Sequence, residues 1–173
     1  NMEYIHTLKL LKFPLDIETL QGPFSSYYYN PDNSGYDDIF VKPLAACAFV
    51  SVLRDFHEEY NGKYEVAFGD MFHPLDWKEH KTHQSGVCID IRPVRNDGKR
   101  GSLTYSHSAY SFSATSKLIS LAKKAGASNI HFNDPKIINS ISGVSRVGGH
   151  DNHIHLCFHP TETVKRSCMT ITK

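Results

Sequence analysis

Two short segments of alternating character constrain the fold of this chain most strongly. In residues 86–91 and 153–158, every second residue is apolar; the apolar set is Val87, Ile89, Ile91, Ile154, Leu156 and Phe158. Alternation of period two is typical of a β-strand with one buried face. The sequence therefore predicts two strands whose other faces carry Cys88 and Asp90 on the first, and His153, His155 and Cys157 on the second.

Histidines gather at the start of both predicted strands. These positions hold five of the eleven histidines of the chain: His80, His83, His150, His153 and His155. Gly86 lets the chain bend back, so that the His83 imidazole can approach Asp90. Neutral imidazole is the commonest protein ligand of zinc, and a catalytic zinc usually has three protein ligands and one open position. The residues favour a zinc hydrolase.

The spacing of these residues resembles a known family. The pattern His-x-x-His-x-x-Gly-x-x-x-Asp followed by Gly-His-Asp-x-His-x-His is similar to that of the penicillin-insensitive murein endopeptidases, zinc peptidases grouped with lysostaphin-type enzymes, D-Ala-D-Ala carboxypeptidases and the hedgehog domain. The resemblance covers about residues 69–93 and 148–158, and the pair Gly69-Asp70 also resembles a family element. It implies zinc ligands at His83, Asp90 and His155, a catalytic histidine at His153, and further active-site histidines at His80 and His150.

The resemblance implies a metallopeptidase of cell wall degradation, with the peptide stems of peptidoglycan as its substrate. We expect an endopeptidase that cuts the D-Ala to diaminopimelate crosslink. An N-acetylmuramoyl-L-alanine amidase is the alternative within the class, and a non-catalytic zinc-containing binding domain is the alternative outside it. The carboxypeptidase branch is disfavoured, because Asn152 stands where that branch has a glutamate base. If the protein is a toxin, an immunity or inhibitor protein is an expected partner.

Composition adds three expectations. A chain of 173 residues with 40% hydrophobic content suits one catalytic domain over residues 1–173. A net charge of +1 without a long charged run argues against nucleic acid as a partner. No apolar stretch reaches the roughly 18 residues of a membrane span, and no signal peptide opens the chain. A periplasmic or exported location is therefore expected only if the chain lost a signal, is delivered by a secretion machine or phage, or belongs to a larger protein.

The remaining patterns predict an α+β fold, with a central antiparallel sheet that carries the zinc site and helices packed on one side. Helices are expected at residues 43–60, 113–124 and 134–141, and further strands at 64–68 and 129–132. The residues before 43 are expected to be irregular. Their tyrosines (Tyr27, Tyr28, Tyr29 and Tyr36) are more simply core residues than a groove lining. The hydroxyl-rich loop at 95–116 is either an ordinary connection or a substrate contact.

The register of the two motif strands yields a disulfide prediction. If Asp90 lies opposite His155 in an antiparallel pair, Cys88 lies directly opposite Cys157, with Cβ atoms about 4.5 to 5.5 Å apart. A disulfide and a pair of small buried thiols then remain equally compatible with the pattern. Cys47 and Cys168 have no partner that the sequence indicates.

Overall fold

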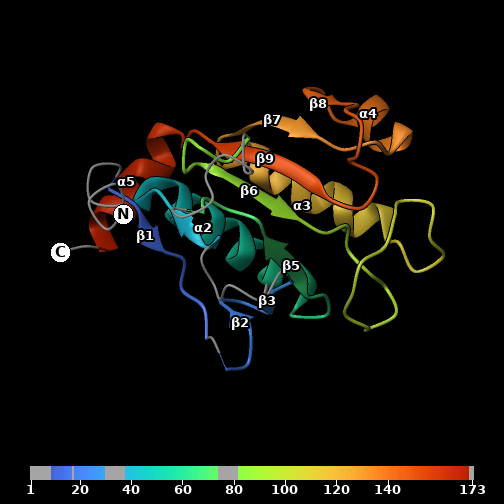
Figure 1. Cartoon of the computed structure of the whole chain (residues 1–173), viewed down its shortest axis with the longest axis horizontal. Coiled ribbons are helices and arrows are strands. Elements are labelled where there is room, and N and C mark those ends of the chain that lie inside the picture. The colour runs from blue at the N-terminus through green and yellow to red at the C-terminus, as the bar shows by residue number, and fades with distance from the viewer. Residues whose placement is uncertain (1–8, 17, 30–37, 74–81, 172–173) are drawn as a thin grey trace.

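A mostly antiparallel sheet forms the centre of the molecule. The computed structural model describes residues 9–16, 18–29, 38–73 and 82–171. Within these residues the sheet has seven strands in the order β2-β3-β5-β6-β9-β7-β8. Their bounds in that order are Gln21–Gly22, Ser26–Tyr28, Val66–Gly69, Cys88–Ile91, Ile154–Phe158, Ala127–His131 and Val144–Ser145. Figure 1 shows β6 and β9 side by side in the middle of the sheet, as their register requires.

The strands around the two motifs pair as predicted, while the outer pairings are mixed. β6 runs antiparallel to β5 and β9, and β9 runs antiparallel to β7. Two pairings are parallel, β3 with β5 and β7 with β8. A separate two-stranded sheet joins β1 (Leu11–Lys12) to β4 (Phe40–Val41). The predicted irregular N-terminal third thus contains several very short strands.

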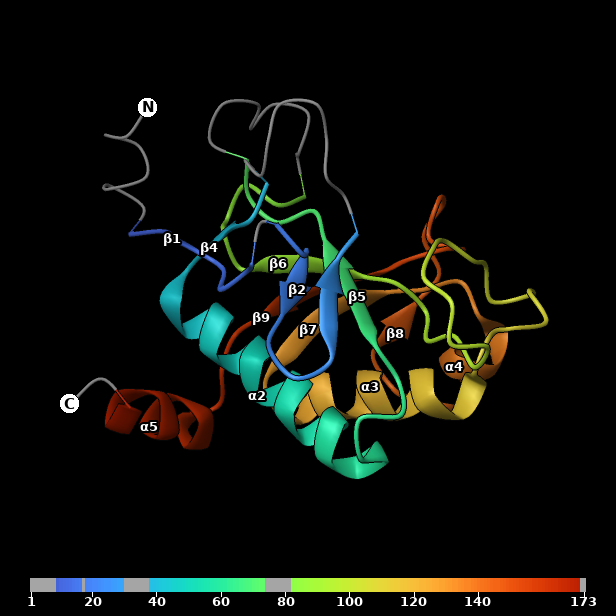
Figure 2. The same cartoon turned by 90° about the horizontal axis from the view of Figure 1, so that it is seen from below.

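Helices cover one face of the sheet, which confirms the predicted α+β class. They are α2 (Pro43–Tyr60), α3 (Phe112–Lys124), α4 (Pro135–Ser140) and α5 (Glu162–Ile171). Figure 2 shows α2 and α3 together beneath the sheet, with α5 next to α2. The short α4 lies beside β8, at the edge of the sheet. The polar side chains of β6 and β9 lie on the opposite face of the sheet.

Local signals explain why the two long helices begin and end where they do. α2 begins at Pro43, whose fixed φ suits the first helical position. It ends at Asn61, which takes the left-handed conformation with φ 48° and is followed by Gly62. Its predicted range of 43–60 is confirmed. At the start of α3, the side chain of Ser111 accepts a hydrogen bond from the backbone N–H of Ala114.

An aromatic cluster fills the space between the sheet and the helices. The ring of Phe68 lies 5.0 Å from that of Phe13 and 5.8 Å from that of Phe49, and Phe49 lies 5.9 Å from Phe158. Tyr27 and Tyr28 are also buried, as expected of core residues, whereas Tyr36 lies outside the described residues. Because the apolar side chains of β6 and β9 point into this core, Asp90 and His155 point out of the other face.

Two disulfides connect the elements. Cys88 in β6 is bonded to Cys157 in β9, with Cα atoms 3.9 Å apart, so the predicted cross-strand pair is a disulfide. Cys47 in α2 is bonded to Cys168 in α5. This second bond could not be predicted from the sequence, since its two cysteines lie 121 residues apart and neither belongs to a motif.

Candidate metal centre

The pairing of β6 with β9 sets Asp90 directly opposite His155, so the predicted register is confirmed. The Nδ1 atom of His155 lies 2.9 Å from Oδ1 of Asp90. Both side chains are buried, which is uncommon for an aspartate without a partner. The pairing of the two strands alone therefore brings two of the three predicted ligands together.

The third predicted ligand, His83, comes from the turn that leads into β6. Gly86 has φ +69°, and a Cβ atom there would lie 2.5 Å from Cδ2 of Leu10, so this bend favours glycine. The bend places Nε2 of His83 3.5 Å from Oδ1 of Asp90. Nδ1 of His83 lies 3.3 Å from the carbonyl oxygen of Cys88, a contact that directs Nε2 toward Asp90.

These three side chains have the geometry of a metal site. Their donor atoms all lie within 4.8 Å of one another, and each side chain is at least nine-tenths buried. Zinc bonds of about 2.0 to 2.2 Å in a tetrahedron require donors about 3.3 to 3.6 Å apart, close to the observed separations. His83, Asp90 and His155 could therefore hold a metal ion with small adjustments.

The charges of the three groups are coupled. Burial alone would raise the pKa of Asp90, but hydrogen bonds to His155 and His83 outweigh it and hold that pKa well below its usual range. Burial alone would lower the pKa of His83. The hydrogen bond with Asp90 and the negative charge of Asp90 outweigh this effect and hold the pKa of His83 above its ordinary value. Asp90 is consequently ionised at neutral pH, as a metal ligand must be.

Two of the predicted catalytic histidines lie beside the three candidate ligands. Nε2 of His153 is 3.7 Å from Oδ2 of Asp90, and its Nδ1 is 2.9 Å from Oδ1 of Asn152. The ring of His150 lies 4.6 Å from that of His153. Burial lowers the pKa of His153, and the nearby His150 and Arg92 lower it further, against the opposing charge of Asp90. His80 lies outside the described residues.

Sequence reasoning missed one histidine of this cluster. His131 ends β7, where it pairs with His155 of β9, and the two rings are stacked with centroids 5.6 Å apart. Burial and the neighbouring histidines lower the pKa of His131, which favours its neutral form. The only signal in the sequence was a histidine in a predicted strand, and the order of the strands was needed to place it beside the motif.

Three further side chains border the cluster on the β5 side. Oδ2 of Asp70 lies 4.0 Å from Nε2 of His83, so the weak Gly69-Asp70 signal does mark a residue near the site. Arg92 stacks on Tyr29, with Cζ 4.2 Å from the ring centroid, and donates to the carbonyl oxygen of Asn152 at 3.1 Å. Burial, followed by the charge of Asp90, raises the pKa of the Tyr29 phenol, so the hydroxyl stays protonated.

The hydroxyl-rich segment predicted as a loop at 95–116 is a loop only up to Ser111, because α3 begins at Phe112. This loop approaches the same cluster. The backbone N–H of Tyr105 donates to the carbonyl oxygen of Asp151 at 3.1 Å, and Nδ2 of Asn152 lies 3.5 Å from Oγ of Ser102. The loop therefore lies next to the second histidine motif, as a substrate contact would require.

The cross-strand disulfide lies immediately beside the candidate ligands. Sγ of Cys157 is 3.4 Å from Nε2 of His155, the ring nitrogen that faces away from Asp90. The donor atoms of Cys88, His155 and Cys157 also all lie within 4.8 Å of one another. His155 thus belongs to two groups of possible metal ligands.

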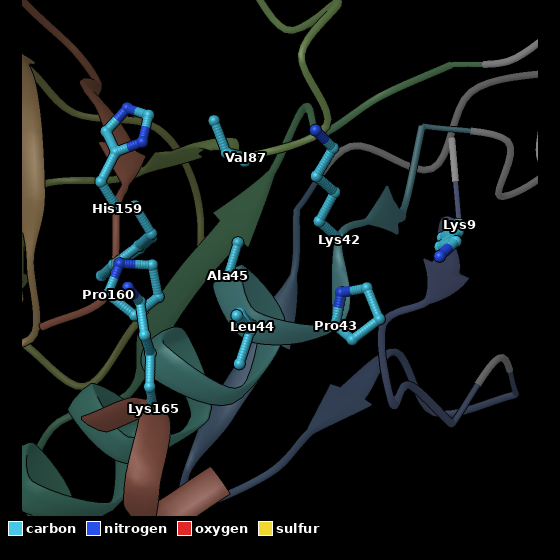
Figure 3. A pocket seen from close by; sticks show the side chains of 10 residues that line it. Lys9, Lys42, Pro43, Leu44, Ala45, Val87, His159, Pro160 and Lys165 are labelled. Atoms are coloured by element: carbon cyan, nitrogen blue, oxygen red, sulfur yellow. The ribbon is translucent and has the colours of Figure 1, made fainter. Parts of the chain in front are cut away.

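A cavity of about 660 Å³ lies elsewhere, at the start of α2 (Figure 3). It is lined by Val87 and Phe158, which alternate with Cys88 and Cys157 and therefore face the other side of the sheet. Lys9, Lys42 and Lys165 line it as well. None of the candidate ligands contributes to this cavity.

Among the described residues, no helix combines the length and apolar character needed to cross a membrane. A comparison of the chain with protein-family models and with curated proteins finds no match.

Proposed function

We propose that the protein is a zinc-dependent hydrolase that cuts an amide bond of peptidoglycan. The observation that carries the proposal is the buried group of His83, Asp90 and His155, with the half-buried His153 directly beside it. Burial of imidazoles and a carboxylate lowers the stability of a fold unless these groups are paired with one another or bind a metal. Additional imidazoles beside such a group are what acid–base chemistry requires.

Zinc is the metal that suits these ligands best. Two imidazoles and one carboxylate form a common donor set of catalytic zinc sites. Bound there, zinc would act as a Lewis acid that polarises an amide carbonyl and acidifies a water molecule at the open position.

The neighbouring histidines supply the proton transfers. His153 has a lowered pKa and is therefore neutral near pH 7, so that Nε2 can accept a proton from the attacking water and later deliver it to the leaving amine. The contact of its Nδ1 with Asn152 fixes the orientation of the ring. The rings of His150 and His131 are close enough to His153 and His155, respectively, to stabilise their positions or relay a proton.

The substrate is proposed from the resemblance to the murein endopeptidases. The D-Ala to diaminopimelate crosslink is the first candidate. The bond between muramic acid and the stem peptide is the second, since one metal site serves either amide. Two disulfides support a location outside the cytoplasm, where thiols become oxidised and where peptidoglycan lies.

Digestion of purified sacculi, followed by mass spectrometry of the soluble products, tests the proposal. An endopeptidase cuts the crosslinks and leaves glycan chains that keep their stem peptides, and a muramidase added afterwards converts these chains to uncrosslinked muropeptides. An amidase instead releases stem peptides, with their crosslinks intact, and bare glycan chains. Chelation of the metal should abolish either activity, and added zinc should restore it. A zinc-loaded protein that binds sacculi but releases no product would be a binding domain and would contradict the proposal.

A further inference from the structure

His155 presents its two ring nitrogens to two different groups of donors. Nδ1 faces Asp90 at 2.9 Å, within the group that includes His83. Nε2 faces Sγ of Cys157 at 3.4 Å, within the group that includes Cys88. Both cysteines are buried, on the same face of the sheet and two residues along each strand from Asp90 and His155.

The chemistry of the second group depends on the state of its sulfur atoms. In the disulfide, neither sulfur atom is a thiolate, and a thiolate is the form that binds zinc. As thiolates, two cysteines and one imidazole form a typical zinc-binding set, and soft sulfur ligands hold zinc more tightly than a carboxylate does.

We propose that reduction of the Cys88–Cys157 disulfide creates a second zinc site from Cys88, Cys157 and His155, and that this site withdraws the metal from His83 and Asp90. The two sites exclude one another, because a neutral imidazole binds a metal through only one of its nitrogens. The disulfide then determines which group of ligands holds the ion.

A dithiol reductant transfers two electrons and two protons to the disulfide, which yields two cysteine thiols and the oxidised, cyclic form of the reductant. When zinc binds, the two thiols release two protons to solvent. Oxidation of the thiols by a disulfide donor reverses both steps and returns His155 to Asp90 and His83.

The consequence is a metal centre that assembles only in an oxidising compartment. In a reducing compartment the zinc would lie between the two thiolates, away from the carboxylate of Asp90. The inference rests on the metal centre and not on the identity of the substrate.

The test uses a chain in which only one disulfide can form. Replacement of Cys47 and Cys168 by serine leaves Cys88 and Cys157 as the remaining cysteines. In this background, His83→Ala removes a ligand of the first site and leaves the second intact. We expect the oxidised His83→Ala protein to bind little zinc, and the same protein reduced with a phosphine to bind about one zinc per chain.

Cobalt identifies the ligands directly. Reduction of the cobalt-loaded parent with intact His83 should produce the near-ultraviolet charge-transfer band of cobalt–thiolate bonds, which the oxidised protein lacks. A matched variant with serine at Cys88 and Cys157 should show neither this band nor the gain of zinc after reduction. Circular dichroism establishes that each variant remains folded.

Two results would overturn the inference. One is a folded, reduced His83→Ala protein that stays free of zinc, and the other is a gain of zinc in the variant without Cys88 and Cys157. Digestion of sacculi by the oxidised parent is measured separately, so a protein that moves its metal but cuts nothing would refute the proposed function alone.

Discussion

Asp90 is the residue on which the site depends, since one carboxylate contacts three histidines. Its Oδ1 faces His83 and His155, and its Oδ2 faces His153. This arrangement explains why an aspartate is tolerated at a position that is only 5% exposed. It also means that loss of the carboxylate disturbs metal binding and proton transfer together.

The three ligands can be tested one at a time. His83→Ala, Asp90→Ala and His155→Ala should each lower zinc occupancy by about 10-fold or more, because a three-ligand site that loses one ligand holds its metal weakly. Metal analysis of the purified, oxidised proteins measures this. His159→Ala, an exposed histidine close to the site in sequence, is the control that should keep its zinc. Full occupancy in the His155 variant would refute the ligand assignment.

His153 should behave differently. His153→Ala is expected to keep its zinc but to lose hydrolysis by about 10² to 10⁴, the usual effect of removing a general acid or base. Zinc occupancy and the initial rate of amide cleavage in sacculi are measured on the same preparation. If this variant lost the metal while His155→Ala retained it, the two roles would have to be exchanged.

The coupled charges predict how stability changes with pH in the metal-free protein. The pKa of His83 lies above its ordinary value of about 6.5, so its contact with Asp90 stabilises the fold below that pH and ceases to do so as pH rises through the raised pKa. The lowered pKa of Asp90 makes its own contribution present above about pH 4 and lost in stronger acid. His83→Gln should therefore cost more stability at about pH 5.5 than at about pH 8.5. Urea unfolding of the chelator-treated parent and variant at both pH values measures the loss of unfolding free energy caused by the substitution. An equal loss at the two pH values would contradict the coupling between His83 and Asp90.

At the residue scale, the sequence could predict the contacts of residues that lie within the same short motif. The close grouping of His83, Asp90 and His155 could be predicted because each lies within a compact motif, and the place of His153 beside them because it is two residues from His155. His131 could not, since it lies outside both motifs, 19 residues before His150, and reaches His155 only through the pairing of β7 with β9.

At the scale of elements, the register of β6 and β9 could be predicted because ligands of one metal must lie side by side. The helix α2 could be predicted because Pro43 and Asn61-Gly62 mark both of its ends. Strands of two residues such as β2 and β8 could not, because alternation needs more positions to be visible. The parallel pairings with β3 and β8 also depend on long connections that leave no local pattern.

The helix α5 illustrates an element held by a covalent bond. It packs against α2 and is tied to it by the Cys47–Cys168 disulfide, which closes a loop of more than one hundred residues. Replacement of both cysteines by serine should lower the free energy of unfolding by about 2 to 4 kcal/mol. Urea unfolding measures this loss. Hydrogen exchange should become faster in Glu162–Ile171 and stay unchanged in α3, and unchanged exchange in α5 would show that packing alone holds it.

At the scale of the whole molecule, the aromatic cluster joins the sheet to the helices. Phe68 lies at its centre, fully buried and in contact with Phe13 and Phe49. Phe68→Ala should destabilise the protein by about 3 to 5 kcal/mol, since it leaves a cavity in the core. Phe112→Ala, at a side chain that is 38% exposed, should change stability by less than about 1 kcal/mol. A single cooperative urea transition in both variants would support the prediction of one domain, and two separate transitions would contradict it.

The alternation of β6 and β9 has a consequence for how this protein can vary in length. Because side chains on a strand alternate between faces, deletion or insertion of one residue between Cys88 and Asp90 would turn core residues outward and the ligands inward. Such a change would destroy the hydrophobic packing and the metal centre in one step, although a substitution at the same place would affect only one of them. Relatives of this chain should consequently differ in length within the 95–111 loop, whereas the two central strands tolerate no gap.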